Sequence, residues 1–156
     1  MSKKYRGIFA WSIVSLAVIG FIFSNSAATR AASDGLSSGF ADFIYSLVAP
    51  ILSVSFESFH VFVRKAAHFT EFAALGVSVW MIAWSVRKLC GQLHAASAFL
   101  AALAVAVTDE FIQSFTDRSS AVADIILDFS GAVFGIVITA TIVYLANIKK
   151  EPSKPS

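Results

Sequence analysis

Charged side chains are scarce in this 156-residue chain, since Asp, Glu, Lys and Arg together make up only 14% of it. Soluble domains have about 25% charged residues, so the composition excludes an ordinary soluble domain. The formal net charge is only +2, and the basic residues are scattered along the chain, which argues against nucleic-acid binding. The single cysteine, Cys90, rules out a disulfide within the chain.

Apolar side chains dominate, with 57% hydrophobic residues and a mean hydropathy of +0.75. Each membrane span needs about 20 residues, so the chain has room for about four spans and no separate soluble domain. The sequence therefore predicts an all-α, polytopic membrane helix bundle in one domain over residues 1–156. The expected transmembrane helices cover approximately residues 8–24, 66–86, 94–115 and 125–148.

Two segments allow more than one interpretation. The basic start, apolar run and small residues Ser26-Ala27-Ala28 also fit a secretory signal peptide, although an uncut first span is favoured. Residues 40–53 have apolar side chains at helical spacing but are broken by Pro50. We expect this segment to form an amphipathic helix at the membrane interface.

The distribution of basic residues predicts the orientation of the chain. With four spans, one side holds both termini and most of the Lys and Arg residues, including Arg87 and Lys88, while the other holds Arg30, Arg64, Lys65 and Arg118. Cytoplasmic loops are the more basic ones. Both termini are therefore expected in the cytoplasm of a bacterial inner membrane, and the acidic residues other than Glu151 on or toward the outer side.

Ionisable residues also occur within or beside the apolar segments, although a charged group at the centre of a membrane helix costs about 2.5 to 3.5 kcal/mol even on lenient scales. On a helix, Arg64, His68 and Glu71 project from one face, with Glu71 the deepest. A carboxylate in that position requires a cation or strong hydrogen-bond donors, or else a proton. His68 is the nearest candidate partner for Glu71.

The later segments carry a second polar set. Asp124 and Asp128 share a helix face that continues through Gly131 and Gly135, a spacing that allows another helix to approach closely. We expect the alanine-rich third span to be that partner, which would bring Asp128 toward Asp109 or Glu110. The hypothesis is one outward-facing polar pocket, with Arg64, Lys65 and Arg118 at its mouth.

These motifs resemble those of the VanZ-like membrane proteins of bacteria. The matching residues run from Arg64-Lys65-x-x-His68-Phe69-x-Glu71-Phe72 through Asp109-Glu110-x-x-Gln113-x-Phe115 and Arg118-Ser119 to Asp124, Asp128, Gly131-Ala132 and Gly135. Phe23-Ser24-Asn25-Ser26 is similar to the end of that family's first span. Thr116-Asp117 departs from the Pro-Gly usual before the arginine. The resemblance implies a multi-span bacterial envelope protein from a family whose namesake contributes low-level resistance to teicoplanin, and it supplies no established reaction.

Two classes of function fit these residues. In the first, the pocket binds or modifies a membrane lipid, either an anionic lipid or a lipid-linked cell-wall precursor. Candidate acid/base residues are His68, Glu71, Asp109 and Glu110, and candidate binding residues are Arg64, Lys65, Gln113, Arg118, Asp124 and Asp128. The second class is a small proton- or ion-coupled transporter, which would have to be a homo-oligomer because no inverted repeat is present.

Several features stay open or are not predicted. A purely structural scaffold would also explain the charged residues. No nucleophile motif is recognisable, so whether the protein is an enzyme is left open. No cofactor is predicted. A histidine with carboxylates could ligate a divalent metal, but no HxxxH-type or cysteine spacing supports zinc, so we predict no metal site.

Overall fold

The computed structural model describes residues 5–27, 44–46, 55–116 and 121–148, and these are almost entirely helical, with no strand in the ranges given. The long helices are α1 (Arg6–Ala27), α3 (Phe56–Cys90), α4 (Ala95–Gln113) and α5 (Val122–Ile148). All four are long and apolar enough to cross a membrane. The predicted all-α, multi-pass membrane bundle is thereby confirmed.

The second long helix differs most from its expected bounds. The sequence predicted a span over residues 66–86, whereas α3 begins at Phe56. Ser55 caps this earlier start, because its hydroxyl accepts a hydrogen bond from the backbone N–H of Ser58. At the other end Gly91 adopts φ 77°, the left-handed conformation that closes many helices. Of the expected interfacial helix at 40–53, only residues 44–46 lie in the described part of the chain, and they are helical.

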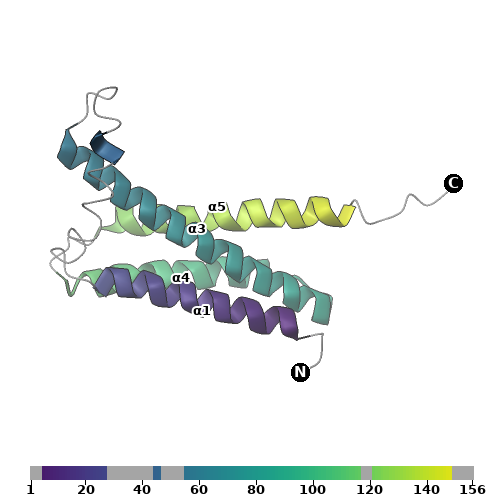
Figure 1. The fold of residues 1–156 in the computed structure, drawn as a ribbon. Coiled ribbons are helices and arrows are strands. Elements are labelled where there is room, and N and C mark those ends of the chain that lie inside the picture. The colour runs from purple at the N-terminus through teal and green to yellow at the C-terminus, as the bar shows by residue number, and fades with distance from the viewer. Residues whose placement is uncertain (1–4, 28–43, 47–54, 117–120, 149–156) are drawn as a thin grey trace.

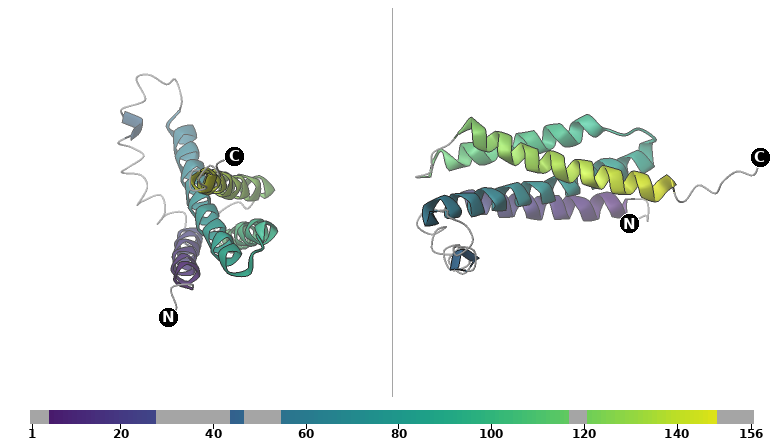
Figure 2. Two further views of the ribbon diagram at one scale, coloured as in Figure 1. Left: turned by 90° about the vertical axis from the view of Figure 1, so that its right-hand side faces the viewer. Right: turned by 90° about the horizontal axis from the view of Figure 1, so that it is seen from above.

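Helix α3 is the element that holds the bundle together. It contacts α1, α4 and α5, while α4 also contacts α1 and α5. Figure 1 shows α3 crossing the bundle obliquely, and the end-on view in Figure 2 shows it between α1 and α5. Helix α1 begins and α5 ends at the same end of the bundle, so the end of α1 and the start of α5 lie at the opposite end.

The closest contact between helices joins the backbones of α3 and α5. A Cβ atom at Gly131 or Gly135 would collide with a backbone carbonyl of α3, and one at Gly76 would collide with α5. The pairs are Gly131 with Phe69, Gly135 with Ala73, and Gly76 with Ala132. The sequence predicted the close approach but assigned it to the alanine-rich third span, which was wrong. The glycine face of α5 packs on α3, where Gly76 and Ala73 are small enough to receive it.

Helix α4 uses its alanines to pack into the core, where it contacts both α3 and α5. One core cluster consists of buried side chains from all four helices, namely Ile22, Phe72, Leu75, Ala102, Ala106 and Ala132. Ser15 also donates a 2.9 Å hydrogen bond to Ser78, which joins α1 to α3 inside the bundle. Many large apolar side chains, such as Leu16, Phe111 and Ile142, point outward, as expected of helices that face lipid.

Candidate functional site

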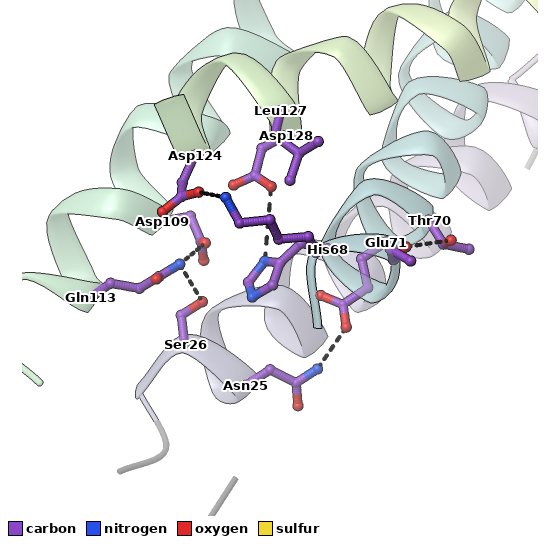
Figure 3. A network of polar contacts seen from close by, with 12 residues as sticks. Asn25, Ser26, His68, Thr70, Glu71, Asp109, Gln113, Asp124, Leu127 and Asp128 are labelled. Carbon is purple, nitrogen blue, oxygen red and sulfur yellow. Dashed lines mark hydrogen bonds and ion pairs between the residues drawn. The ribbon is translucent and has the colours of Figure 1, made fainter. Parts of the chain in front are cut away.

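The polar residues of four helices meet at one end of the bundle. The end of α1, the N-terminal half of α3, the end of α4 and the start of α5 all lie there, because the helices alternate in direction. Figure 3 shows the side chains that converge between them. We call the set Asn25, Ser26, His68, Glu71, Asp109, Glu110, Gln113 and Asp128 the polar cluster.

The centre of the polar cluster is formed by His68, Asp109 and Asp128. Nδ1 of His68 lies 3.9 Å from Oδ1 of Asp128, and one ligand atom from each of the three residues lies within 4.8 Å of the other two. Asp109 is 0% exposed and Asp128 2% exposed. Three separate helices therefore place a partly exposed histidine next to two buried aspartates.

Gln113 orients Asp109 within the cluster. Its Nε2 donates a 2.7 Å hydrogen bond to Oδ2 of Asp109, one helical turn earlier on α4. The same amide lies 3.5 Å from Oγ of the buried Ser26 on α1. Oδ1 of Asp109 has no hydrogen-bond partner among the described residues. Gln113 thus fixes one oxygen of this carboxyl group and leaves the other directed into the cluster (Figure 3).

Glu71 receives its hydrogen bond from the first helix. Nδ2 of Asn25 donates to Oε1 of Glu71 at 3.0 Å, which joins the end of α1 to α3. The sequence had pointed to His68 as the nearest partner of Glu71. In the structure Asn25 donates to Glu71, and Nδ1 of His68 lies 3.9 Å from Oδ1 of Asp128 (Figure 3), while the pairing of His68 with Glu71 stays a prediction.

Glu110 connects the end of α4 to the start of α5. It is only 6% exposed, and its Oε1 accepts a hydrogen bond from the backbone N–H of Ala121, the residue before α5 begins. The first N–H groups of a helix have no partner within the helix, and a carboxylate there also interacts favourably with the helix dipole. This contact gives Glu110 a structural task in addition to the candidate acid/base role.

The basic residues lie at the edge of the polar cluster. Nζ of Lys65 forms a 3.1 Å ion pair with Oδ1 of Asp124, and both side chains are partly exposed, at 48% and 31%. Arg64 is half-buried and stands one helical turn before His68, on the same face of α3. Arg118 lies outside the described residues.

The structure brings together most of the residues predicted for the site. His68, Glu71, Asp109, Glu110, Gln113 and Asp128 belong to the polar cluster, and Lys65 with Asp124 lies at its edge. Sequence reasoning missed Asn25 and Ser26 as members. The available signal was Ser24-Asn25-Ser26, a polar end to an apolar helix that also resembles the family pattern.

The chemistry of the polar cluster follows from its burial and composition. Charges in a low-dielectric environment interact more strongly than in water, and a buried carboxylate pair is unfavourable unless a proton or a cation lies close. Carboxylates accept hydrogen bonds and bind cations, while imidazole can take up or donate a proton or ligate a metal. The arrangement suits binding of a ligand that brings hydrogen-bond donors or positive charge.

The fold and the polar cluster define a class, a multi-pass helical membrane protein with a histidine and carboxylates gathered inside one end of its bundle. The sequence model of the VanZ/LLP1 family matches residues 10–144, which takes in all the residues of the cluster. The chain belongs to the VanZ/LLP1 family. No curated protein and no solved structure was found to match it.

Proposed function

We propose that the protein binds the headgroup of a phosphate-bearing lipid or lipid-linked envelope molecule at the polar cluster. The observation that carries the proposal is that buried hydrogen-bonding side chains from four helices converge near the ends of those helices. Asp128 stands six residues after Val122, the first residue of α5, which corresponds to about 9 Å along the helix axis. A headgroup at the membrane surface can reach that depth.

In the proposed binding mode, two sets of residues contact different parts of the headgroup. Arg64 and Lys65, at the edge of the cluster, contact the phosphate, since guanidinium and ammonium groups donate hydrogen bonds to phosphate oxygens. The carboxylates of Asp109 and Asp128 accept hydrogen bonds from hydroxyl or amide groups of the same ligand. The ligand is thus a lipid whose headgroup carries both an anion and hydrogen-bond donors.

The proposal places the cluster on the extracytoplasmic side of a bacterial inner membrane, where cell-wall precursors are displayed. This orientation follows from the excess of Lys and Arg in the segments on the side of the two termini. A contribution to teicoplanin-type resistance would follow if binding changes how such a precursor is presented. The proposed function is binding of the headgroup alone, without a catalytic step.

The binding proposal is tested by the lipids that accompany the purified full-length protein. We expect mass spectrometry to find phosphate-bearing lipids enriched over their content in the host membrane, and this enrichment to fall in Arg64→Ala. The matched control is Arg87→Ala, at the opposite end of the same helix, where the side chain is exposed and lies 4.7 Å from the Trp84 ring. Equal lipid content in the two variants, or no enrichment at all, would refute the proposal.

The same pair of variants tests the link to resistance. A glycopeptide-sensitive bacterium that expresses the wild-type chain or Arg87→Ala should tolerate more teicoplanin than one that expresses Arg64→Ala at the same level. If all three strains are equally sensitive, the contribution to resistance is refuted while lipid binding stands on its own measurement.

A further inference from the structure

We infer that His68, Asp109 and Asp128 form a binding site for one divalent transition-metal ion inside the bundle. This inference does not depend on headgroup binding. It depends on the positions of the three side chains and on carboxylate oxygens that have no hydrogen-bond donor. It also depends on which metals imidazole and carboxylate groups prefer to bind.

The distances between the three groups suit a shared ion. Ligand atoms of His68, Asp109 and Asp128 all lie within 4.8 Å of one another. Nitrogen and oxygen ligands bind zinc at about 2.0 to 2.2 Å, so in tetrahedral coordination two ligands of one ion lie about 3.3 to 3.6 Å apart. Side-chain rotations that bring the ligand atoms up to about 1.5 Å closer to one another complete the coordination. The three residues come from α3, α4 and α5, so one ion would join three helices.

The carboxyl groups present oxygen atoms that lack a donor. Among the described residues, neither Oδ1 of Asp109 nor Oδ2 of Asp128 has a hydrogen-bond partner, and both are fully shielded from solvent. A buried, unpaired carboxylate oxygen is strongly unfavourable, so native structures rarely retain one without a cation or a proton. Both oxygens belong to the centre of the cluster that Figure 3 shows around His68.

A second layer of contacts orients one of these ligands. Gln113 donates to Oδ2 of Asp109 at 2.7 Å, which leaves Oδ1 as the atom available to an ion. Metal-binding carboxylates are commonly held in this way by a neighbouring hydrogen-bond donor. The 3.5 Å contact between Gln113 and Ser26 extends the support to α1.

The composition of the site selects the class of ion. Magnesium and calcium prefer ligand sets made of oxygen atoms, whereas an imidazole nitrogen suits zinc, copper, iron or nickel, and the two carboxylates also suit manganese. Two carboxylates and one neutral imidazole carry a charge of about −2, which a divalent ion neutralises. The neighbouring Lys65 is paired with Asp124 outside the buried centre. Three protein ligands also leave a coordination position open, as in sites where a metal holds an exchangeable ligand.

The inference is tested by metal binding to the purified full-length protein in detergent, after removal of metal with a chelator. Titration with Zn²⁺ and Mn²⁺ should saturate at one ion per chain, and Mg²⁺ should bind at least about tenfold more weakly. His68→Ala, Asp109→Asn and Asp128→Asn should each weaken binding by at least tenfold. Glu57→Gln, which removes an exposed acid in the first turn of α3, should bind like the wild type.

Thermal unfolding distinguishes a variant that has lost the metal site from one that binds metal poorly because it does not fold. The metal-free wild type should be stabilised by added Zn²⁺ or Mn²⁺, while Asp128→Asn should be at least as stable as the metal-free wild type and gain nothing from metal. The inference is overturned if the wild type binds no ion, or if Asp128→Asn retains the wild-type affinity. A stable, metal-insensitive wild type would mean that a proton, and not a metal, occupies the centre. Because no lipid is added, these results are separate from the lipid enrichment that tests headgroup binding.

Discussion

Asn25 of α1 donates a 3.0 Å hydrogen bond to Glu71 of α3, and this contact attaches the first helix to the polar cluster. Hydrogen bonds between membrane helices contribute about 0.6 kcal/mol on average, and those to charged groups more. We expect Asn25→Leu to lower the free energy of unfolding by about 1 to 2 kcal/mol, because Glu71 loses a donor. Denaturation of the purified protein in mixed detergent micelles measures the change.

A double substitution separates the contact from the residues themselves. Asn25→Leu combined with Glu71→Leu removes both polar groups, so the double variant should be more stable than the sum of the two single changes predicts. Strict additivity of the two losses would mean that the hydrogen bond contributes nothing to stability.

The α3–α5 contact predicts different outcomes at two glycines. Gly135→Ala would place a methyl group against the Ala73 backbone, and we expect it to destabilise the bundle by about 1 to 3 kcal/mol. Gly20→Ala is the matched control, because a Cβ there meets nothing within 4 Å. It should leave stability unchanged or raise it by up to about 1 kcal/mol, through helix propensity alone. Similar unfolding curves for the two variants would contradict the close backbone packing.

The contact between Glu110 and Ala121 predicts a cost for losing the carboxyl group. Glu110→Ala leaves the N–H of Ala121 without its acceptor, so we expect a loss of about 0.5 to 2 kcal/mol, the range for a lost helix cap. Glu110→Gln keeps an acceptor oxygen and should lose less. Thermal unfolding of both variants tests this, and an equal loss would show that the charge of Glu110, and not its hydrogen bond, matters.

The exposed ion pair of Lys65 and Asp124 should contribute little to stability. Partly exposed pairs are worth about 0 to 1 kcal/mol, so Lys65→Gln should unfold within about 1 kcal/mol of the wild type. High salt should reduce the difference further. A larger loss in the same unfolding assay would mean that this pair is part of the bundle's structural core.

The single cysteine offers a direct test of orientation. Cys90 is exposed at the end of α3, on the side of the bundle where α1 begins and α5 ends. With both termini in the cytoplasm, a membrane-impermeant maleimide should label Cys90 in lysed cells but not in intact ones. A cysteine introduced at Ser55, at the opposite end of α3, should show the reverse pattern. Labelling of Cys90 from outside would invert the proposed topology.

The sequence was sufficient to predict the four spans, for identifiable reasons. It also brought Asp128 toward Asp109 or Glu110, but from a packing of the glycine face of α5 on α4 that the structure does not have. Length and hydropathy define spans directly, because the hydrocarbon layer imposes both. Helical periodicity shows which residues of one helix share a face, so the grouping of Asp128 with Gly131 and Gly135 could be recognised. Periodicity does not show which helix lies opposite that face. The choice of the alanine-rich span as the partner of α5 was wrong for this reason.

Asn25 was missed as a member of the site for a related reason. Its role depends on where the end of α1 lies relative to Glu71, a residue 46 positions later in the chain. The close grouping of His68 with Asp109 and Asp128 likewise arises from three helices, so no local spacing such as HxxxH could reveal it. When a site is formed by residues from several helices, its only signal in the sequence is an isolated polar residue in each apolar segment.

The glycine contacts between α3 and α5 also set how precisely the cluster is built. Phe69, whose carbonyl faces Gly131, is the residue after His68, and Gly131 comes three residues after Asp128. Because the backbone of α3 packs directly against the backbone of α5, no side-chain rotation can adjust the distance between the two helices. A methyl group added at this crossing would therefore widen the gap between imidazole and carboxylate, and ligand affinity should report such remote changes sensitively.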